Sequence, residues 1–148
     1  DALEYNSRFE GIADCVIADV PCSGLGVVRR KPEIKYKEPS DFDRLPEIQY
    51  DILKTSSEYV KVGGTLVYST CTFAPEEDEG QVAAFLQRHP EFTLADALGN
   101  VDYTFGSAGE ANRTGEAFGS DSGLCRMSIT PAKYNSDGFF IAKFIRLR

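Results

Sequence analysis

The sequence predicts an α/β fold with a mixed sheet in which one strand runs against the others. Short β-branched apolar runs alternate with longer segments of helical spacing, which is typical of strands joined by crossover helices. Two apolar runs close to the C-terminus are separated by a short turn, which favours an antiparallel hairpin. The chain has 148 residues, 42% of them hydrophobic, and this is enough for one domain with its own core.

The first strand is predicted at residues 14–19, a β-branched run followed by Pro21, where the backbone donor is lost. Residues 24–26 (Gly-Leu-Gly) supply the turn that must follow. Further on, the hydroxyl of Ser40 could cap a short helical turn that begins at Asp41.

The first helix is predicted to begin around Pro46, a residue that suits the first helical turn. Apolar residues such as Ile48 and Ile52 recur from there at helical spacing. The pair Gly63 and Gly64 is expected to end this helix, because glycine adopts left-handed conformations without strain.

A second strand follows at residues 65–70, which are rich in β-branched and aromatic side chains. The second helix is predicted to begin at Pro75. The acidic run 76–79 then favours the positive end of the helix dipole, and Val82 and Phe85 belong to an apolar stripe. We interpret the acidic run as this ordinary feature of a helix N-terminus.

Residues 98–123 contain six glycines among small polar residues and are expected to form a long loop. Strands are predicted at 124–129 and 138–145, joined through 131–137 as the hairpin.

The net charge of −7 argues at first sight against a nucleic-acid partner, since phosphate affinity comes from Lys and Arg. A basic cluster nevertheless occupies 29–37, and taken alone it fits a solvated loop and a phosphate-binding segment equally well. No apolar stretch approaches 18 residues, so no membrane partner is expected and a cytoplasmic protein is favoured. The chain opens at Asp1 without Met or a secretory segment, which favours excision from a longer protein.

The four cysteines are Cys15, Cys22, Cys71 and Cys125, and none belongs to a C-x-x-C pair or accompanies a histidine cluster. A metal site is therefore not expected. Cys15 and Cys125 lie in apolar runs, where a free cysteine is usually a small core residue.

Cys22 and Cys71 each follow a predicted strand, within D-V-P-C-S-G (19–24) and S-T-C-T (69–72). In an open α/β sheet the ligand site lies outside the carboxyl ends of the strands. The two thiols are therefore expected to face one crevice, where they could serve a chemistry that uses two thiols and no metal.

Other thiol and nucleotide sites fit poorly. A tyrosine-phosphatase loop would place Arg six residues after Cys22, where Val28 stands. A cysteine protease needs a histidine base, and His89 is interpreted as a solvated residue at a helix end. The G-L-G turn fails as a dinucleotide fingerprint because Arg29 takes the third glycine position.

Four motifs, taken in their order along the chain, resemble those of a known family. They are D-V-P-C-S-G-L-G (19–26), R-R-K-P-E-I-K (29–35), G-G-T-L-V-Y-S-T-C-T-F-A-P-E-E-D-E (63–79) and D-G-F-F-I-A-K (137–143). Together they resemble the Sun family of RNA 5-methylcytosine methyltransferases over nearly the whole chain, and are most similar to the bacterial branch that methylates small-subunit ribosomal RNA. Val20 departs from the D-A-P-C form that is often found there.

The resemblance implies a class I S-adenosylmethionine-dependent methyltransferase fold of Rossmann-like type. Residues 1–148 would be the C-terminal portion of the catalytic domain, with the cofactor loop and the RNA-binding region before it. Asp1 resembles the family's third cofactor motif, an acidic residue near the adenine. The alternative is a non-catalytic structural fragment or degenerate scaffold of such an enzyme.

The resemblance also implies roles for the motif residues. Cys71 matches the nucleophile that adds to carbon 6 of cytosine, and Cys22 the residue that assists the later elimination. Asp19 matches the acid between S-adenosylmethionine and the base, Pro21 would hold the turn rigid, and Ser23 would donate to the substrate.

For the RNA partner, expected to be ribosomal RNA, the resemblance makes Arg29, Arg30 and Lys31 candidates for phosphate contacts. The strand at 15–18 would normally pair with a preceding strand, so the isolated chain is expected to self-associate through an exposed sheet edge.

Overall fold

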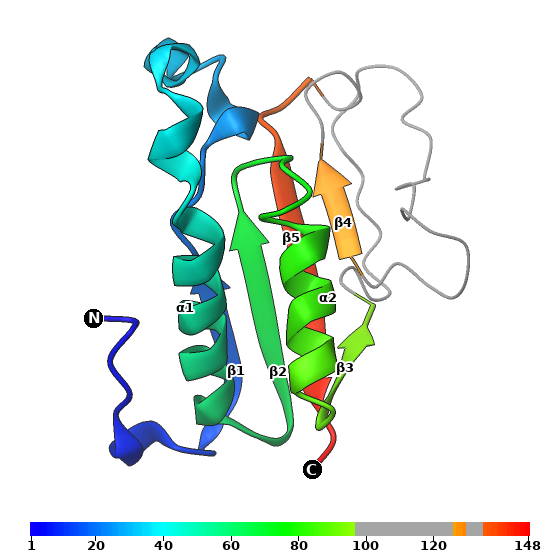
Figure 1. Ribbon diagram of the computed structural model, residues 1–148. Coiled ribbons are helices and arrows are strands. Elements are labelled where there is room, and N and C mark those ends of the chain that lie inside the picture. The colour runs from blue at the N-terminus through cyan, green and yellow to red at the C-terminus, as the bar shows by residue number, and fades with distance from the viewer. Residues whose placement is uncertain (97–125, 130–134) are drawn as a thin grey trace, which may run out of the picture.

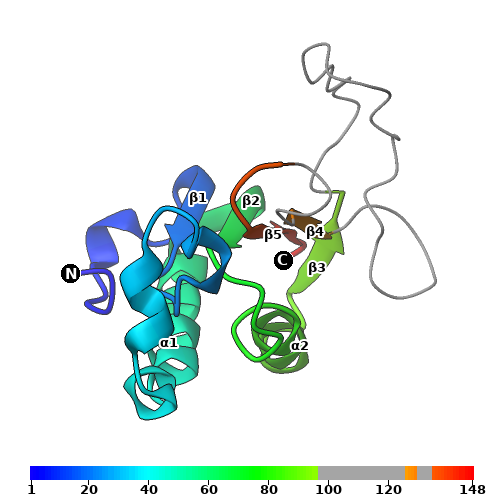
Figure 2. The same ribbon diagram turned by 90° about the horizontal axis from the view of Figure 1, so that it is seen from above.

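The computed structural model describes residues 1–96, 126–129 and 135–148. They form one mixed sheet with two helices packed on the same face, as Figures 1 and 2 show. The strands are β1 (Ala13–Asp19), β2 (Val60–Thr70), β3 (Phe92–Ala95), β4 (Arg126–Ile129) and β5 (Phe139–Arg146), and the helices are α1 (Leu45–Tyr59) and α2 (Glu79–Arg88). Short 3-10 helices cover Ser7–Phe9, Leu25–Val27, Pro32–Tyr36 and Pro39–Phe42.

The sheet has the order β1-β2-β5-β3, and β4 also pairs with β5. β1 and β2 are parallel, whereas β5 is antiparallel to β2, β3 and β4. The prediction of a mixed α/β sheet with one reversed strand is therefore confirmed, and β5 is that strand. The short strand β3 was not predicted from the sequence.

The hydrophobic core lies between the sheet and the two helices. Alternate residues of β5, among them Phe140 and Phe144, are fully buried on the helix side, and the ring of Phe85 from α2 lies 5.0 Å from that of Phe144. The other sheet face is more open: Ile17 of β1 is 69% exposed. Cys15 lies on that face and is exposed, so the expectation that it belongs to the core was wrong.

Three predicted boundaries were also wrong. The first helix ends at Tyr59, because the chain enters β2 at once and Val60 pairs with Ala13, so Gly63 lies within the strand. The second helix begins at Glu79, after a turn at residues 75–78. The short helical turn is capped by Glu38 instead of Ser40, through a reciprocal capping box.

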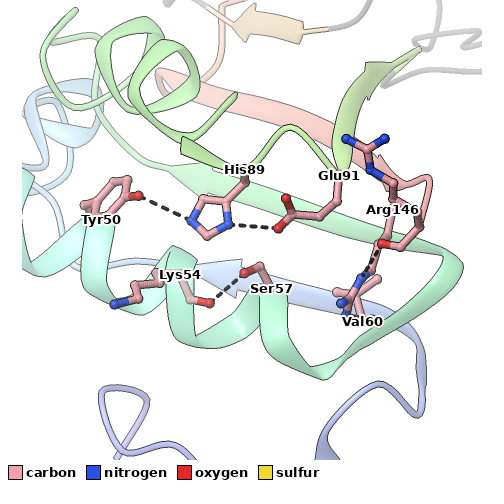
Figure 3. A network of polar contacts seen from close by, with 8 residues as sticks. Tyr50, Lys54, Ser57, Val60, His89, Glu91 and Arg146 are labelled. Carbon is pink, nitrogen blue, oxygen red and sulfur yellow. Dashed lines mark hydrogen bonds and ion pairs between the residues drawn. The ribbon is translucent and has the colours of Figure 1, made fainter. Parts of the chain in front are cut away.

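The end of the sheet opposite the carboxyl ends of β1 and β2 is held by a polar network, shown in Figure 3. His89 contacts the Tyr50 hydroxyl at 3.3 Å and the Glu91 carboxylate at 3.1 Å. Arg146 donates to the carbonyl of Val60 at 2.7 Å. The His89 side chain is 13% exposed, so its interpretation as a solvated residue was wrong.

None of the helices in the described ranges is long and apolar enough to cross a bilayer. The predicted loop at 98–123 and the predicted burial of Cys125 lie outside the described residues.

Candidate active site

The parallel pairing of β1 and β2 brings the two cysteine-bearing turns to the same edge of the sheet. Asp19 pairs with Ser69 at the carboxyl ends of the strands, and the N–H of Val20 donates to the Ser69 carbonyl at 3.1 Å. The turns that follow therefore start side by side, as the rule for ligand sites in α/β sheets requires.

The two thiols of these turns are in direct contact. The sulfur atoms of Cys22 and Cys71 lie 3.2 Å apart, and the N–H of Cys71 donates to the Cys22 sulfur at 3.3 Å. Both are free, half-buried cysteines. Burial, and after it the hydrogen bond to Cys71, raises the pKa of Cys22 to about 12, so this thiol keeps its proton at neutral pH.

Buried polar residues form hydrogen bonds to the turn that carries Cys22. The hydroxyls of Ser23 and Thr72 lie 2.8 Å apart and link the two turns. The N–H of Ser23 donates to Oε2 of Glu77 at 2.9 Å. The Gln49 side-chain amide donates to the same oxygen at 2.8 Å and to the carbonyl of Pro21 at 2.9 Å. The hydroxyl of Ser23 is thus engaged inside the protein.

The acidic run contributes to this site in a way that the sequence did not reveal. Glu77 and Asp78 are 4% and 2% exposed, in the turn before α2. Thr70 donates to Asp78 at 2.6 Å, and burial raises the pKa of the Asp78 carboxyl to about 7. The prediction of an ordinary helix N-terminus did not include the burial of these two residues, because four adjacent acids look alike until the fold decides which face inward.

The glycine turn after Cys22 closes against the C-terminal part of the chain. The N–H of Gly26 donates to the Cys71 carbonyl at 3.0 Å, and the N–H of Gly138 donates to the Gly26 carbonyl at 2.7 Å. A Cβ atom at position 26 would lie 2.4 Å from the Gly138 carbonyl oxygen. Only glycine permits this approach.

The basic cluster reaches toward the same C-terminal segment. Arg29 donates to Asn135 at 3.2 Å, and Arg30 forms an ion pair with Asp137 at 2.6 Å. Lys31 is exposed. Two of the three candidate phosphate contacts are therefore oriented by partners beside the glycine turn.

The two candidate cofactor residues are not brought together. Asp19 is exposed beside the thiol pair and accepts a hydrogen bond from the Ser69 hydroxyl at 2.9 Å. The carboxylate of Asp1 accepts from the N–H of Leu3, close to the N-terminus, which lies beside α1 in Figure 1. The structure thus groups Asp19 and Pro21 with the two cysteines but places Asp1 apart.

The sequence of this chain matches the model of a known family over almost the whole length of the chain. The family model described as 16S rRNA methyltransferase RsmB/F matches residues 1–145. The chain belongs to this family. Its α/β mixed sheet is a fragment of the Rossmann-like fold of S-adenosylmethionine-dependent methyltransferases, as the Sun resemblance implied.

Individual relatives agree with this assignment. The chain is 40% identical over 147 residues to a probable ribosomal RNA small subunit methyltransferase B of Bacillus subtilis, of which it spans 29%. Among solved structures it is similar to a protein called PH0851 (TM-score 0.77, 27% identity, 99% of this chain and 30% of that one). It is also similar to NSun6 from Pyrococcus horikoshii with SFG (TM-score 0.69, 26% identity, 100% of this chain and 33% of that one).

Proposed function

We propose that this chain is the C-terminal portion of the catalytic domain of an enzyme that transfers a methyl group from S-adenosylmethionine to carbon 5 of a cytosine in 16S ribosomal RNA. The observation that carries the proposal is the pair of free thiols, 3.2 Å apart, at the carboxyl ends of two parallel strands. The names of the relatives support a small-subunit ribosomal RNA substrate.

Two thiols suit this reaction because carbon 5 of cytosine is a weak nucleophile. The Cys71 thiolate adds to carbon 6, and the electron pair of the 5,6 double bond makes carbon 5 nucleophilic. S-adenosylmethionine, when bound, supplies the methyl group. Carbon 5 then gives its proton to a solvent water molecule, the electrons of that C–H bond restore the double bond, and the bond between carbon 6 and Cys71 breaks to return the thiolate.

The division of labour between the thiols is the one that the Sun resemblance implies, with Cys71 as the nucleophile. Burial raises the pKa of Cys22, which is consistent with this choice because a protonated thiol is a poor nucleophile. The protonated Cys22 can donate to the Cys71 sulfur, 3.2 Å away, while the carbon–sulfur bond breaks. Cys22 therefore assists release.

Asp19 fits a role beside both cofactor and base. Its carboxylate is exposed at the edge of the thiol pair, and only its Oδ1 is bonded within the described residues, to the Ser69 hydroxyl. The second oxygen can accept from a polar ligand group. Asp1 as an adenine contact and Ser23 as a donor to the substrate stay predictions.

The residues proposed to contact the phosphates of the RNA backbone are Arg29, Arg30 and Lys31. Arg29 and Arg30 are fixed by Asn135 and Asp137, and Lys31 is exposed for a phosphate contact. Replacing Lys31 with Ala should weaken RNA binding and reduce the slope of its salt dependence by about one unit.

The test uses the full-length protein with a cytosine-containing RNA and S-adenosylmethionine. Cys71→Ala should abolish methylation and form no covalent complex. Cys22→Ala should instead accumulate a protein–RNA adduct that survives denaturing electrophoresis, and the double variant should lose that adduct. An adduct that required Cys22 and persisted without Cys71 would reverse the two roles.

The exposed Cys15 offers a matched control, since it lies outside the site. Cys15→Ala should methylate RNA like the wild type. If neither Cys22 nor Cys71 mattered more than Cys15, the cysteine-adduct mechanism would be abandoned.

These 148 residues alone should be inactive, because they span 29% of the Bacillus subtilis relative. In isolation the chain would then be a structural fragment of the enzyme.

A further inference from the structure

We propose that Glu77 is a positioning residue that holds the Cys22 thiol against Cys71. Its Oε2 accepts the N–H of Ser23, the residue after Cys22, and the amide of Gln49. That same amide donates to the carbonyl of Pro21, the residue before Cys22. The peptide groups on both sides of Cys22 are therefore tied to one carboxyl oxygen.

Burial makes these bonds costly to lose. Glu77 is 4% exposed and Gln49 is fully buried. Removing the shared acceptor would leave two buried N–H donors without a partner, and each such donor carries a desolvation penalty. The Oε1 atom of Gln49 has no hydrogen-bond partner within the described residues, so the two donated bonds alone fix the orientation of this amide.

Glu77 is itself anchored to the strand that precedes Cys71. Its carbonyl accepts the hydroxyl of Tyr68 at 2.6 Å, and its N–H donates to the Ala74 carbonyl at 3.0 Å. Tyr68 is fully buried in β2. Through Glu77, the Cys22 turn is thus attached to β2. The position of Cys71 is set by the same strand.

The catalytic consequence rests on the proposed function. Without Glu77 the Cys22 turn keeps its other links to β2 and to the Cys71 turn, but the peptide groups on either side of Cys22 lose their common anchor. Cys71 keeps its own place after β2. Addition of Cys71 to the base should then continue, whereas release, which needs Cys22 beside Cys71, should slow.

Three variants separate positioning from general damage. Glu77→Met keeps a similar volume and removes the acceptor. Glu77→Gln keeps one carbonyl oxygen that can take the place of Oε2 and should rescue the arrangement. Gln81→Met is the matched control, because Gln81 is 6% exposed and donates to the carbonyls of Pro46 and Glu76 without a bond to the Cys22 turn or to the Glu77 side chain.

The first measurement does not depend on catalysis. In the full-length protein with Cys15 and Cys125 replaced by Ser, diamide should oxidise Cys22 and Cys71 to a disulfide, taking up two electrons and two protons as it becomes the hydrazine. Peptide mapping follows the rate. Glu77→Met should slow this step roughly tenfold or more, equivalent to about 1.4 kcal/mol, and Glu77→Gln and Gln81→Met should stay near the starting rate. An unchanged rate in folded Glu77→Met would overturn the proposal.

Should Glu77→Met fail to fold, Gln49→Met takes its place, because it removes the bonds from Gln49 to Pro21 and to Glu77 but leaves the bond from the Ser23 N–H to Glu77. It should slow disulfide formation by a smaller factor than predicted for Glu77→Met, and an unchanged rate would again count against the proposal.

The second measurement uses RNA and S-adenosylmethionine. Glu77→Met should accumulate the covalent adduct as Cys22→Ala does, and should add nothing in the Cys22→Ala background. A purely structural role would lower adduct formation in both backgrounds and would contradict the proposal. If no variant, Cys22→Ala included, formed an adduct, the proposed function would fail, while the oxidation rates would still decide the role of Glu77.

Discussion

The Cys22 and Cys71 sulfur atoms lie 3.2 Å apart, within hydrogen-bonding distance, while both residues remain free thiols. The contact joins two residues 49 positions apart in the chain. It arises because each cysteine closely follows one of two paired parallel strands.

This proximity predicts sensitivity to oxidation. A mild disulfide oxidant should convert the two thiols to a disulfide, since a thiolate at one position has the other sulfur within reach. RNA methylation should be lost completely and return with dithiothreitol. Cys15→Ser should keep this sensitivity, and oxidation confined to Cys15 in peptide maps would contradict the prediction.

Asp78 predicts a pH-dependent stability. Its pKa is raised from 3.8 to about 7 in the fold, so the folded state binds one more proton than the unfolded state between these values, and stability falls as pH rises through that window. Asp78→Asn removes this dependence and still accepts from Thr70. The difference in free energy of unfolding between Asp78→Asn and the wild type should grow in favour of the variant by on the order of 2 kcal/mol from about pH 5 to pH 7 and then level off.

Urea unfolding at several pH values measures this difference. Glu76→Gln, at an exposed neighbour, is the control and should follow the wild-type profile. A constant difference between Asp78→Asn and wild type would show that Asp78 titrates normally.

Gly26→Ala should destabilise the fold by about 2 kcal/mol. The added Cβ would lie 2.4 Å from the Gly138 carbonyl oxygen and 2.8 Å from that of Cys71, so the backbone beside the thiol pair must shift. Gly80→Ala is a milder comparison, since its Cβ would lie 3.1 Å from the Pro75 carbonyl oxygen. Position 80 is also in α2, where alanine has a higher helix propensity than glycine. Equal urea midpoints for the two variants would argue against the close approach.

The 148 residues in isolation should self-associate through β1, which lies at one edge of the described sheet and has Ile17 exposed. Sedimentation should show the mean mass rising with concentration. Ile17→Lys should reduce this association, because charged side chains discourage pairing at sheet edges. A monomer at every concentration would refute the prediction.

The mixed sheet, apart from β3, and the proximity of Cys22 and Cys71 could be predicted from the sequence. Strand runs and helical spacing are local signals, and the rule about carboxyl ends of strands turns them into a site. The β3 strand escaped detection because its four residues, Phe92–Ala95, are too short to show a period. Its place in the sheet depends on pairing with β5.

The buried hydrogen bonds that hold the Cys22 turn could not be predicted from the sequence. Glu77 and Gln49 are 28 positions apart, and each is a residue type that is usually exposed. Only the packing of α1 and the turn before α2 behind the Cys22 loop brings them together. The outward-facing Cys15 was misjudged for a related reason, since an apolar run does not tell which sheet face is covered.

The register between β1 and β2 restricts where the chain can change in length. Asp19 pairs with Ser69, and Cys22 and Cys71 follow within a few residues. One residue inserted between a paired position and its cysteine would displace that sulfur from its partner, which lies 3.2 Å away. Insertions and deletions should therefore be excluded from these two short stretches. The exposed stretch 35–37, which lies outside the sheet, should tolerate a change of length better.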